Sequence, residues 1–328
     1  MMRIKILGTG KYLPGCIVTA EDLDCKLNLP KGWVAKKSGI LQRHHAKSET
    51  ASQMGACAAH EALTAANLVG EDIDCIIGAS GTMEQAIPCN AVLIKEAMGL
   101  QATSIPVFDI NATCLSFLIA FDTAACLISA GRYRRILIVS SDIASHALDW
   151  DHKESCILFG DGAAAVVVGA GEGKSGILTS RFETYSRGAH LAEVKGGGTA
   201  IHPREYSEET KKDFLFRMDG ERLFRMSLEY APTFMQFLMK DANTCFDEID
   251  LVIPHQASLN GLRLLQRHLS IPNHKFLVRI QEYGNTMAAS IPMMLDDAIR
   301  SHKINRGERI MLIGTAAGFS IGGMIIDF

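Results

Sequence analysis

Apolar runs of strand length alternate with amphipathic stretches of helical length along the whole chain. Residues 1–15 interleave charged and apolar positions and predict a first strand and its turn. Later runs such as Ala163–Ala170 are almost wholly apolar, which is typical of strands buried on both faces. Stretches such as Ala51–Asn67 and Ser227–Ala242 have a helical pattern. The alternation predicts an α/β protein built from βαβ units around mostly buried sheets.

The pattern occurs twice. An acidic turn leads into an apolar strand at residues 71–77 and again at 247–253. A basic turn leads into another strand at 131–139 and again at 306–313. The offset from Ile73 to Ile249 is nearly the same as the offset from Ile136 to Ile310, and two matches at nearly one offset indicate a duplication. We predict two halves, residues 1–175 carrying a nucleophile and residues 176–328 carrying its partners.

Composition narrows the class of protein. Of 328 residues, 48% are hydrophobic and 21% charged, which suits a compact globular protein. The net charge of −3 gives no overall attraction to nucleic acid, so an anionic partner needs a local basic patch. Uninterrupted apolar stretches stay below about 18 residues, and the N-terminus lacks the apolar core of a signal peptide. We expect no membrane span.

Nine cysteines, an odd number without a C-x-x-C pair, argue against a disulfide framework and a zinc ribbon. The adjacent pair His44-His45 lacks the spacing of helical metal ligands. We therefore expect no metal site and a location in the reducing cytoplasm.

Cys114 is the candidate nucleophile. A short strand-like run, Phe108–Ile110, ends in small and polar residues, and an apolar helical stretch begins just after Cys114. Unpaired N–H groups and the dipole at a helix start favour a thiolate, which accepts acyl groups readily. The alternative is that Cys114 is one more small buried residue.

Two further residues are candidate partners of Cys114. Asn285 lies at the corresponding junction of the second half, ahead of the strand of Ile310 much as Cys114 lies ahead of the strand of Ile136. His255 directly follows the predicted strand at 251–253, and strand ends in α/β sheets are where pockets form. A helix cap for Asn285 and a structural role for His255 are the alternatives.

Several short motifs match one enzyme family in the same order along the chain. They are Ile6–Pro14, Trp33 with Ser38–Ile40 and Arg43-His44, Ala112–Phe117, Phe159–Gly162, Pro254–Ala257, and Tyr283–Thr286 with Ala288–Ser290. Over essentially its whole length the sequence resembles the β-ketoacyl-acyl-carrier-protein synthase III branch of the thiolase superfamily. The resemblance implies a homodimer with a five-layer αβαβα fold made of two duplicated halves.

The resemblance also implies a chemistry. Cys114, His255 and Asn285 form a catalytic triad, and the backbone N–H groups of Cys114 and Ala317 form the oxyanion hole. Cys114 takes an acyl group from a thioester, and the acyl-enzyme then condenses with a malonyl thioester as carbon dioxide leaves. Coenzyme A or phosphopantetheine thioesters are substrates, and no cofactor is permanently bound.

The substrate-binding positions depart from the family pattern more than the triad does. Arg is frequent at the Lys37 and Lys153 positions, Asn at Ser258, Arg at Asn260, and Phe at Ile87 and Thr315. By resemblance, the substrate-binding residues are Trp33, Lys37, Ile87, Lys153, Ser258, Asn260 and Thr315. The smaller residues predict donors longer than acetyl.

A basic face is expected to dock an acyl carrier protein. Arg263 and Arg267 have i, i+4 spacing and share a face if that stretch is helical. With Arg225 they are placed near the pocket mouth by resemblance. The alternative is that all three are ordinary solvated helix charges.

Other functions remain open at the level of sequence. Cys114 is also compatible with non-condensing acyl transfer, with condensation of two acyl-CoA molecules, or with a non-catalytic acyl-binding scaffold. A papain-like peptidase has Cys, His and Asn in the same order, but no Cys-Gly-Ser-Cys-Trp run surrounds Cys114.

Overall fold

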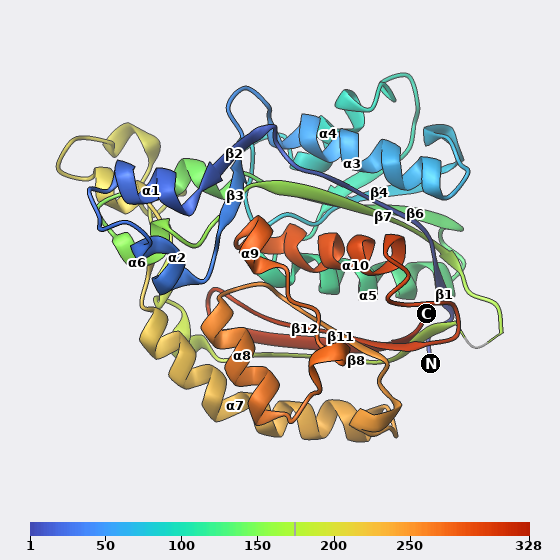
Figure 1. The fold of residues 1–328 in the computed structure, drawn as a ribbon. Coiled ribbons are helices and arrows are strands. Elements are labelled where there is room, and N and C mark those ends of the chain that lie inside the picture. Colours follow the sequence, from blue (N-terminus) through green and yellow to red (C-terminus); the bar gives the residue numbers. More distant parts are fainter. Residues whose placement is uncertain (174) are drawn as a thin grey trace.

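A computed structural model describes residues 1–173 and 175–328, and in this part of the chain two large sheets form the centre of the molecule (Figure 1). The first has the strand order β1 (Ile4–Tyr12), β7 (Gly162–Ala170), β6 (Arg135–Asp142), β4 (Cys75–Gly78), β5 (Val107–Asp109). The second has the order β8 (Gly176–Thr184), β13 (Ser320–Asp327), β12 (Arg309–Ala316), β11 (Leu251–Pro254).

The two sheets repeat one topology and one register. In the first, parallel strands β4 and β6 place Cys75 opposite Ile136; in the second, parallel strands β11 and β12 place Leu251 opposite Ile310. Antiparallel neighbours follow in the same order, β7 then β1 and β13 then β8. The duplication predicted from the two offsets is confirmed.

Helices complete a five-layer αβαβα arrangement, also as predicted (Figure 1). Helices α5 (Ser116–Ser129) and α10 (Ser290–Arg300) lie between the sheets, where their apolar residues share one core with both. Helices α3 (Ala51–Ala65) and α4 (Asn90–Ala97) cover the outer face of the first sheet, and α7 (Gly220–Asp241) and α8 (Leu259–His268) that of the second. The turns that enter α5 and α10 therefore meet in the middle of the molecule.

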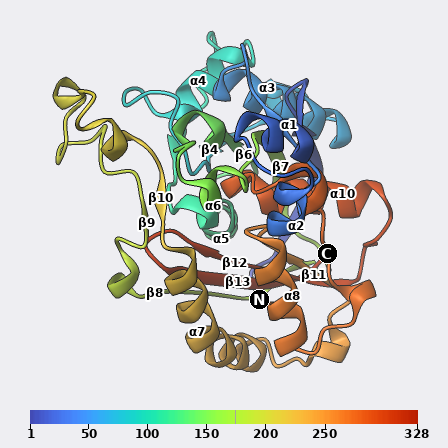
Figure 2. The ribbon, with the colours of Figure 1, turned by 60° about the vertical axis from the view of Figure 1, so that its left-hand side comes forward.

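The remaining elements are short. They are β2 (Cys16–Thr19), α1 (Ala20–Lys26), α2 (Trp33–Ser38), β3 (Gln42–His45), α6 (Lys153–Cys156), β9 (Ala192–Glu193), β10 (Arg217–Met218) and α9 (Ile280–Tyr283). Between β9 and β10 the chain projects from the body of the molecule (Figure 2).

Helix α7 begins at Gly220, two turns earlier than the predicted start at Ser227. The Asp219 side chain accepts a hydrogen bond from the backbone of Arg222 and caps the helix there. Among the helices that the structure describes, none combines the length and the apolar character needed to cross a membrane.

Candidate active site

Cys114 lies in a tight turn between strand β5 and helix α5. The turn is a short 3-10 helix, Thr113–Leu115, and Thr113 has the left-handed φ of +51°. The Asn111 side chain accepts a hydrogen bond from the Thr113 N–H at 2.9 Å, and Ser116 Oγ donates to the Thr113 carbonyl at 2.7 Å. These bonds offset the cost of the unusual backbone and hold Cys114 at the start of a buried helix.

His255 follows β11 and is placed by the second sheet. Its backbone N–H donates to the Ile313 carbonyl of β12 at 2.8 Å, which continues the strand pairing beyond Pro254. Gly314 stands beside it, and a Cβ added there would lie 2.9 Å from the His255 Cβ. The glycine therefore keeps the space that the imidazole occupies.

Asn285 is held by loops from both halves. Its backbone N–H donates to the Leu158 carbonyl at 2.8 Å, and its carbonyl accepts from the Gly160 N–H at 3.1 Å. Its side-chain oxygen accepts from the Met287 N–H at 2.9 Å. That bond assigns the oxygen to the turn and leaves the amide NH₂ as the donor on the cavity side.

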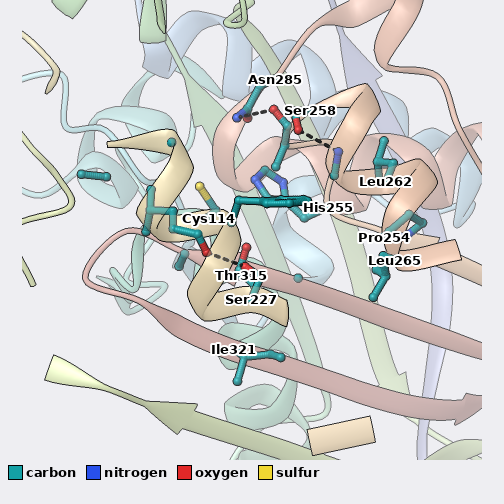
Figure 3. A pocket seen from close by; sticks show the side chains of 18 of the residues that line it. Cys114, Ser227, Pro254, His255, Ser258, Leu262, Leu265, Asn285, Thr315 and Ile321 are labelled. Carbon is teal, nitrogen blue, oxygen red and sulfur yellow. Dashed lines mark hydrogen bonds between the residues drawn. The ribbon is translucent and has the colours of Figure 1, made fainter. Parts of the chain in front are cut away.

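These three side chains line one cavity of about 260 Å³ (Figure 3). Cys114 comes from the first half of the chain, and His255 and Asn285 come from the second. Helices α7 and α8 supply much of an apolar wall, with Leu223, Phe224, Leu228, Ala231, Pro232, Leu262, Leu264 and Leu265. An apolar cleft with a few convergent polar groups is the usual form of a small-molecule site.

Burial dominates the electrostatics of the nucleophile. It raises the pKa of the Cys114 thiol to about 12, and the nearby Asp142 carboxylate raises the pKa further. The backbone N–H groups of Cys114 and Ala317 oppose this shift, so both lie close enough to the sulfur to stabilise negative charge there. The expectation of a thiolate favoured by the helix start is wrong for the resting protein, because desolvation outweighs the two amides.

His255 is uncharged at neutral pH. Burial lowers the pKa of its imidazole to about 4, and Nδ1 has no hydrogen-bond partner among the described residues. A neutral imidazole in this position can take up or donate a proton without first losing one to solvent.

The predicted substrate-binding residues fall into two groups. Ser258 and Thr315 line the cavity together with Ala317, whereas Trp33, Lys37, Ile87, Lys153 and Asn260 are not among the described lining residues. Trp33 packs with a cluster that includes Phe216 and Met287, which do line the cavity. Their roles stay predictions.

Helices α2 and α6 bring two of the predicted lysines to one surface. Lys37 forms an ion pair with Glu154 at 3.5 Å, and Lys153 is the neighbouring residue on α6. Ile87 lies elsewhere, 85% exposed on the loop before α4.

The three arginines predicted to dock a carrier protein do not share one face. Arg225 is exposed on α7, beside the cavity-lining Phe224, and pairs with Glu221. On α8 the cavity is lined by residues such as Leu265, whereas Arg263 and Arg267 border a separate surface depression. Successive residues of a helix are about 100° apart, so these two arginines lie on the side of α8 away from the cavity.

Sequence reasoning did not identify Asp142. It ends β6, is fully buried, and lies close enough to Cys114 to affect the pKa of the thiol. The available signal was the polar run Ser140-Ser141-Asp142 at the end of an otherwise apolar strand.

Comparison with known proteins agrees with this geometry. Residues 108–186 match the family model described as 3-oxoacyl-[acyl-carrier-protein] synthase III, and residues 239–328 match its C-terminal model. The chain is 36% identical over 327 residues to β-ketoacyl-[acyl-carrier-protein] synthase III of Aquifex aeolicus, covering 100% of both chains.

The chain belongs to the 3-oxoacyl-[acyl-carrier-protein] synthase III family.

Two further relatives support this assignment. The synthase III of Neisseria meningitidis serogroup A is 33% identical, with 100% of both chains covered. The crystal structure of the Aquifex aeolicus VF5 synthase III has a TM-score of 0.89 at 34% identity and covers 99% of this chain and 100% of the other. The family assignment makes this synthase III homologue an acyltransferase of the condensing type, with the thiolase-like fold that the sequence predicted. A papain-like peptidase is excluded, and the non-condensing alternatives are not favoured.

Proposed function

We propose that this synthase III homologue loads an acyl group from a thioester onto Cys114 and condenses it with malonyl-acyl-carrier protein. The observation that carries the proposal is the convergence of Cys114, His255 and Asn285 on one apolar cavity, with the Ala317 N–H beside the sulfur. Nucleophile, oxyanion donors and enolate donors then serve two successive steps at one place.

In the first step the Cys114 sulfur attacks the thioester carbonyl. The new bond joins sulfur and acyl carbon, the bond from that carbon to the coenzyme A sulfur breaks, and the thiol proton leaves with coenzyme A. Neutral His255 is in the same cavity and is available to relay that proton. The N–H groups of Cys114 and Ala317 bind the carbonyl oxygen while it carries negative charge.

In the second step the malonyl thioester binds and loses carbon dioxide. The electron pair of the broken carbon–carbon bond becomes an enolate, whose oxygen is bound by an N–H of His255 and the NH₂ of Asn285. The enolate carbon attacks the acyl carbon, the Cys114 sulfur leaves and takes a proton, and a β-ketoacyl thioester is released. This use of His255 and Asn285 requires no metal or bound cofactor.

The assembly and location are part of the same proposal. We infer a homodimer in the cytoplasm, with a boundary between its two similar halves at residues 175 and 176. Met83 and Ile87 are 65% and 85% exposed on one loop, which supports a partner surface there. Trp33, Lys37, Lys153 and Asn260 are proposed to hold the coenzyme A or phosphopantetheine part of the substrates.

The test separates the two half-reactions. Purified protein is incubated with a panel of acyl-CoA thioesters, and the mass added to the Cys114 peptide is measured. Malonyl-acyl-carrier protein labelled in its free carboxyl group is then added, and released carbon dioxide and β-ketoacyl product are quantified. Acylation without carbon dioxide release would reject condensation, and absence of acylation by every thioester would reject the whole proposal.

A further inference from the structure

Asp142 makes an unusually complete set of contacts for a buried carboxylate. It is 0% exposed and accepts hydrogen bonds from five donors of the described chain. Oδ1 accepts from the Gly81 N–H at 2.9 Å and from the N–H and hydroxyl of Thr82, both at 2.8 Å. Oδ2 accepts from the N–H groups of Ala288 and Ala289 at 3.1 and 3.2 Å. One side chain thereby joins two segments that belong to opposite halves of the chain.

The second of these segments also holds Asn285. The three residues Met287–Ala289 form one 3-10 turn. The N–H of its first residue binds the Asn285 side-chain oxygen at 2.9 Å, and the N–H groups of the other two bind Asp142. The orientation of the amide therefore depends on a turn that the carboxylate fixes from the opposite sheet.

The first segment begins the loop that carries Ile87. Gly81 and Thr82 directly precede the exposed stretch that reaches Pro88, and Thr82 also accepts, at its carbonyl, a bond from the Asn90 side chain at 2.8 Å. Asp142 is thus the point at which this loop is joined to the Asn285 turn.

The duplicated half shows that the fold itself does not require an acid at this place. Strand β12 corresponds to β6, has the same length, and ends in Ala316 where β6 ends in Asp142. A buried carboxylate is costly unless fully hydrogen-bonded, and this one also disfavours the thiolate of Cys114. An acid with these two disadvantages indicates a role beyond packing.

We propose that Asp142 is a positioning residue for the condensation half-reaction, which fixes the Met287–Ala289 turn so that the Asn285 amide presents its NH₂ to the malonyl thioester. The inference rests on the proposed function. Asp142 does not touch the substrate cavity in the described structure and acts through Asn285. Loading of Cys114 does not use Asn285, so it is independent of this support.

Asp142→Asn is the isosteric test. Its NH₂ group faces backbone N–H donors on one side, so one of the two connections is lost while side-chain volume is kept. We expect at least about a 10-fold fall in kcat for malonyl decarboxylation and condensation, with little change in KM, because small displacements of a reacting group are costly. Acylation of Cys114 by acyl-CoA is expected to stay within about 3-fold of wild type. Equal losses in both half-reactions, or no loss in either, would overturn the proposal.

A milder pair of variants covers the case in which Asp142→Asn does not fold. Thr82→Val removes the hydroxyl donor and keeps the backbone N–H, and Thr82→Ser restores the hydroxyl. We expect Thr82→Val to lower condensation more than acylation, and Thr82→Ser to recover it at an equal melting temperature. Identical behaviour of the two variants would show that the contact has no positioning role. Failure of the wild type to release carbon dioxide would instead reject the proposed function, so the two failures are distinguishable.

Discussion

Asn111 and Asn285 occupy the same position in the two halves, at the strand-to-helix junction of each. The side-chain oxygen of each accepts a hydrogen bond at 2.9 Å from the N–H of the next residue but one, that of Thr113 or of Met287. Thr113 and Met287 share the left-handed backbone, with φ of +51° and +50°. One turn motif has therefore been used twice.

The two copies of the turn contribute different residues to the cavity. In the first copy the position after the left-handed residue is Cys114, and in the second it is Ala288. The second copy contributes its asparagine instead, since Asn285 lines the cavity. The duplicated fold thus supplies a nucleophile from one half and a hydrogen-bond donor from the other.

Replacing the nucleophile is expected to abolish acyl-enzyme formation. Cys114→Ala removes the sulfur that forms the thioester bond and leaves a side chain that the turn accommodates, so folding should be kept. Cys57→Ala, which removes an exposed free thiol, is the control. Intact-protein mass spectrometry after incubation with acyl-CoA makes the measurement, and full acylation of Cys114→Ala would contradict the assignment.

His255→Ala and Asn285→Ala should impair decarboxylation and condensation more than loading of Cys114. Each removes a donor to the developing enolate, and loss of one such donor typically costs about 10²–10³ in rate. The rates of carbon dioxide release and of acylation are measured separately. Ser258→Ala, at another cavity-lining position, is the comparison. Equal losses in both half-reactions would mean that these roles are misassigned.

The raised pKa of Cys114 predicts a specific pH dependence of alkylation. Iodoacetamide reacts with the thiolate, and a pKa of about 12 leaves the thiol almost wholly protonated at pH 8. Below the pKa, each added pH unit should raise the rate about tenfold, because the thiolate fraction grows by that factor. Peptide mass spectrometry from pH 7 to 10 gives the rates, with circular dichroism as the check on folding. A plateau within this range would show a much lower pKa.

The acyl donor is expected to be longer than acetyl. Ile87 is 85% exposed on its own chain, so contact with an acyl group requires an approach from a second subunit, as the family resemblance implies. An isoleucine there leaves more room than a phenylalanine. We expect kcat/KM to favour butyryl- to decanoyl-CoA over acetyl-CoA, and Ile87→Phe to shift the preference toward acetyl. Met83→Phe, on the same loop, should leave it unchanged. Wild-type preference for acetyl-CoA would reject the idea.

Carrier-protein docking is expected to depend on the basic groups of α7 and α8. Charge reversal at Arg225 plus Arg267 should raise KM for a carrier-linked substrate several-fold, with little effect on the matching coenzyme A substrate, because exposed charges steer association. The single variants decide which helix matters, since Arg225 is beside the cavity and Arg267 is on the far side of α8. Arg134→Glu, just before β6 and at the opposite end of that strand from Asp142, is the charge-matched control. Unchanged carrier kinetics at low salt would rule the surface out.

The sequence alone determined the features that are local in the chain. The strand and helix periods predicted the α/β class, two nearly equal offsets predicted the duplication, and the junction after Ile110 marked Cys114. These succeeded because hydrogen bonding within an element and burial of one face leave a regular pattern along the chain. The start of α7 was predicted late, because its cap at Asp219 precedes the first strongly periodic residues.

Only the tertiary structure decided how these parts act on one another. The approach of the Ala317 N–H to Cys114 and the bonds of Asp142 to Ala288 and Ala289 join opposite halves, so no spacing along the chain encodes them. The protonation state of Cys114 was predicted with the wrong sign for the same reason. A helix start is visible in the sequence, whereas desolvation depends on what the second half packs over the sulfur, and here desolvation is the larger effect.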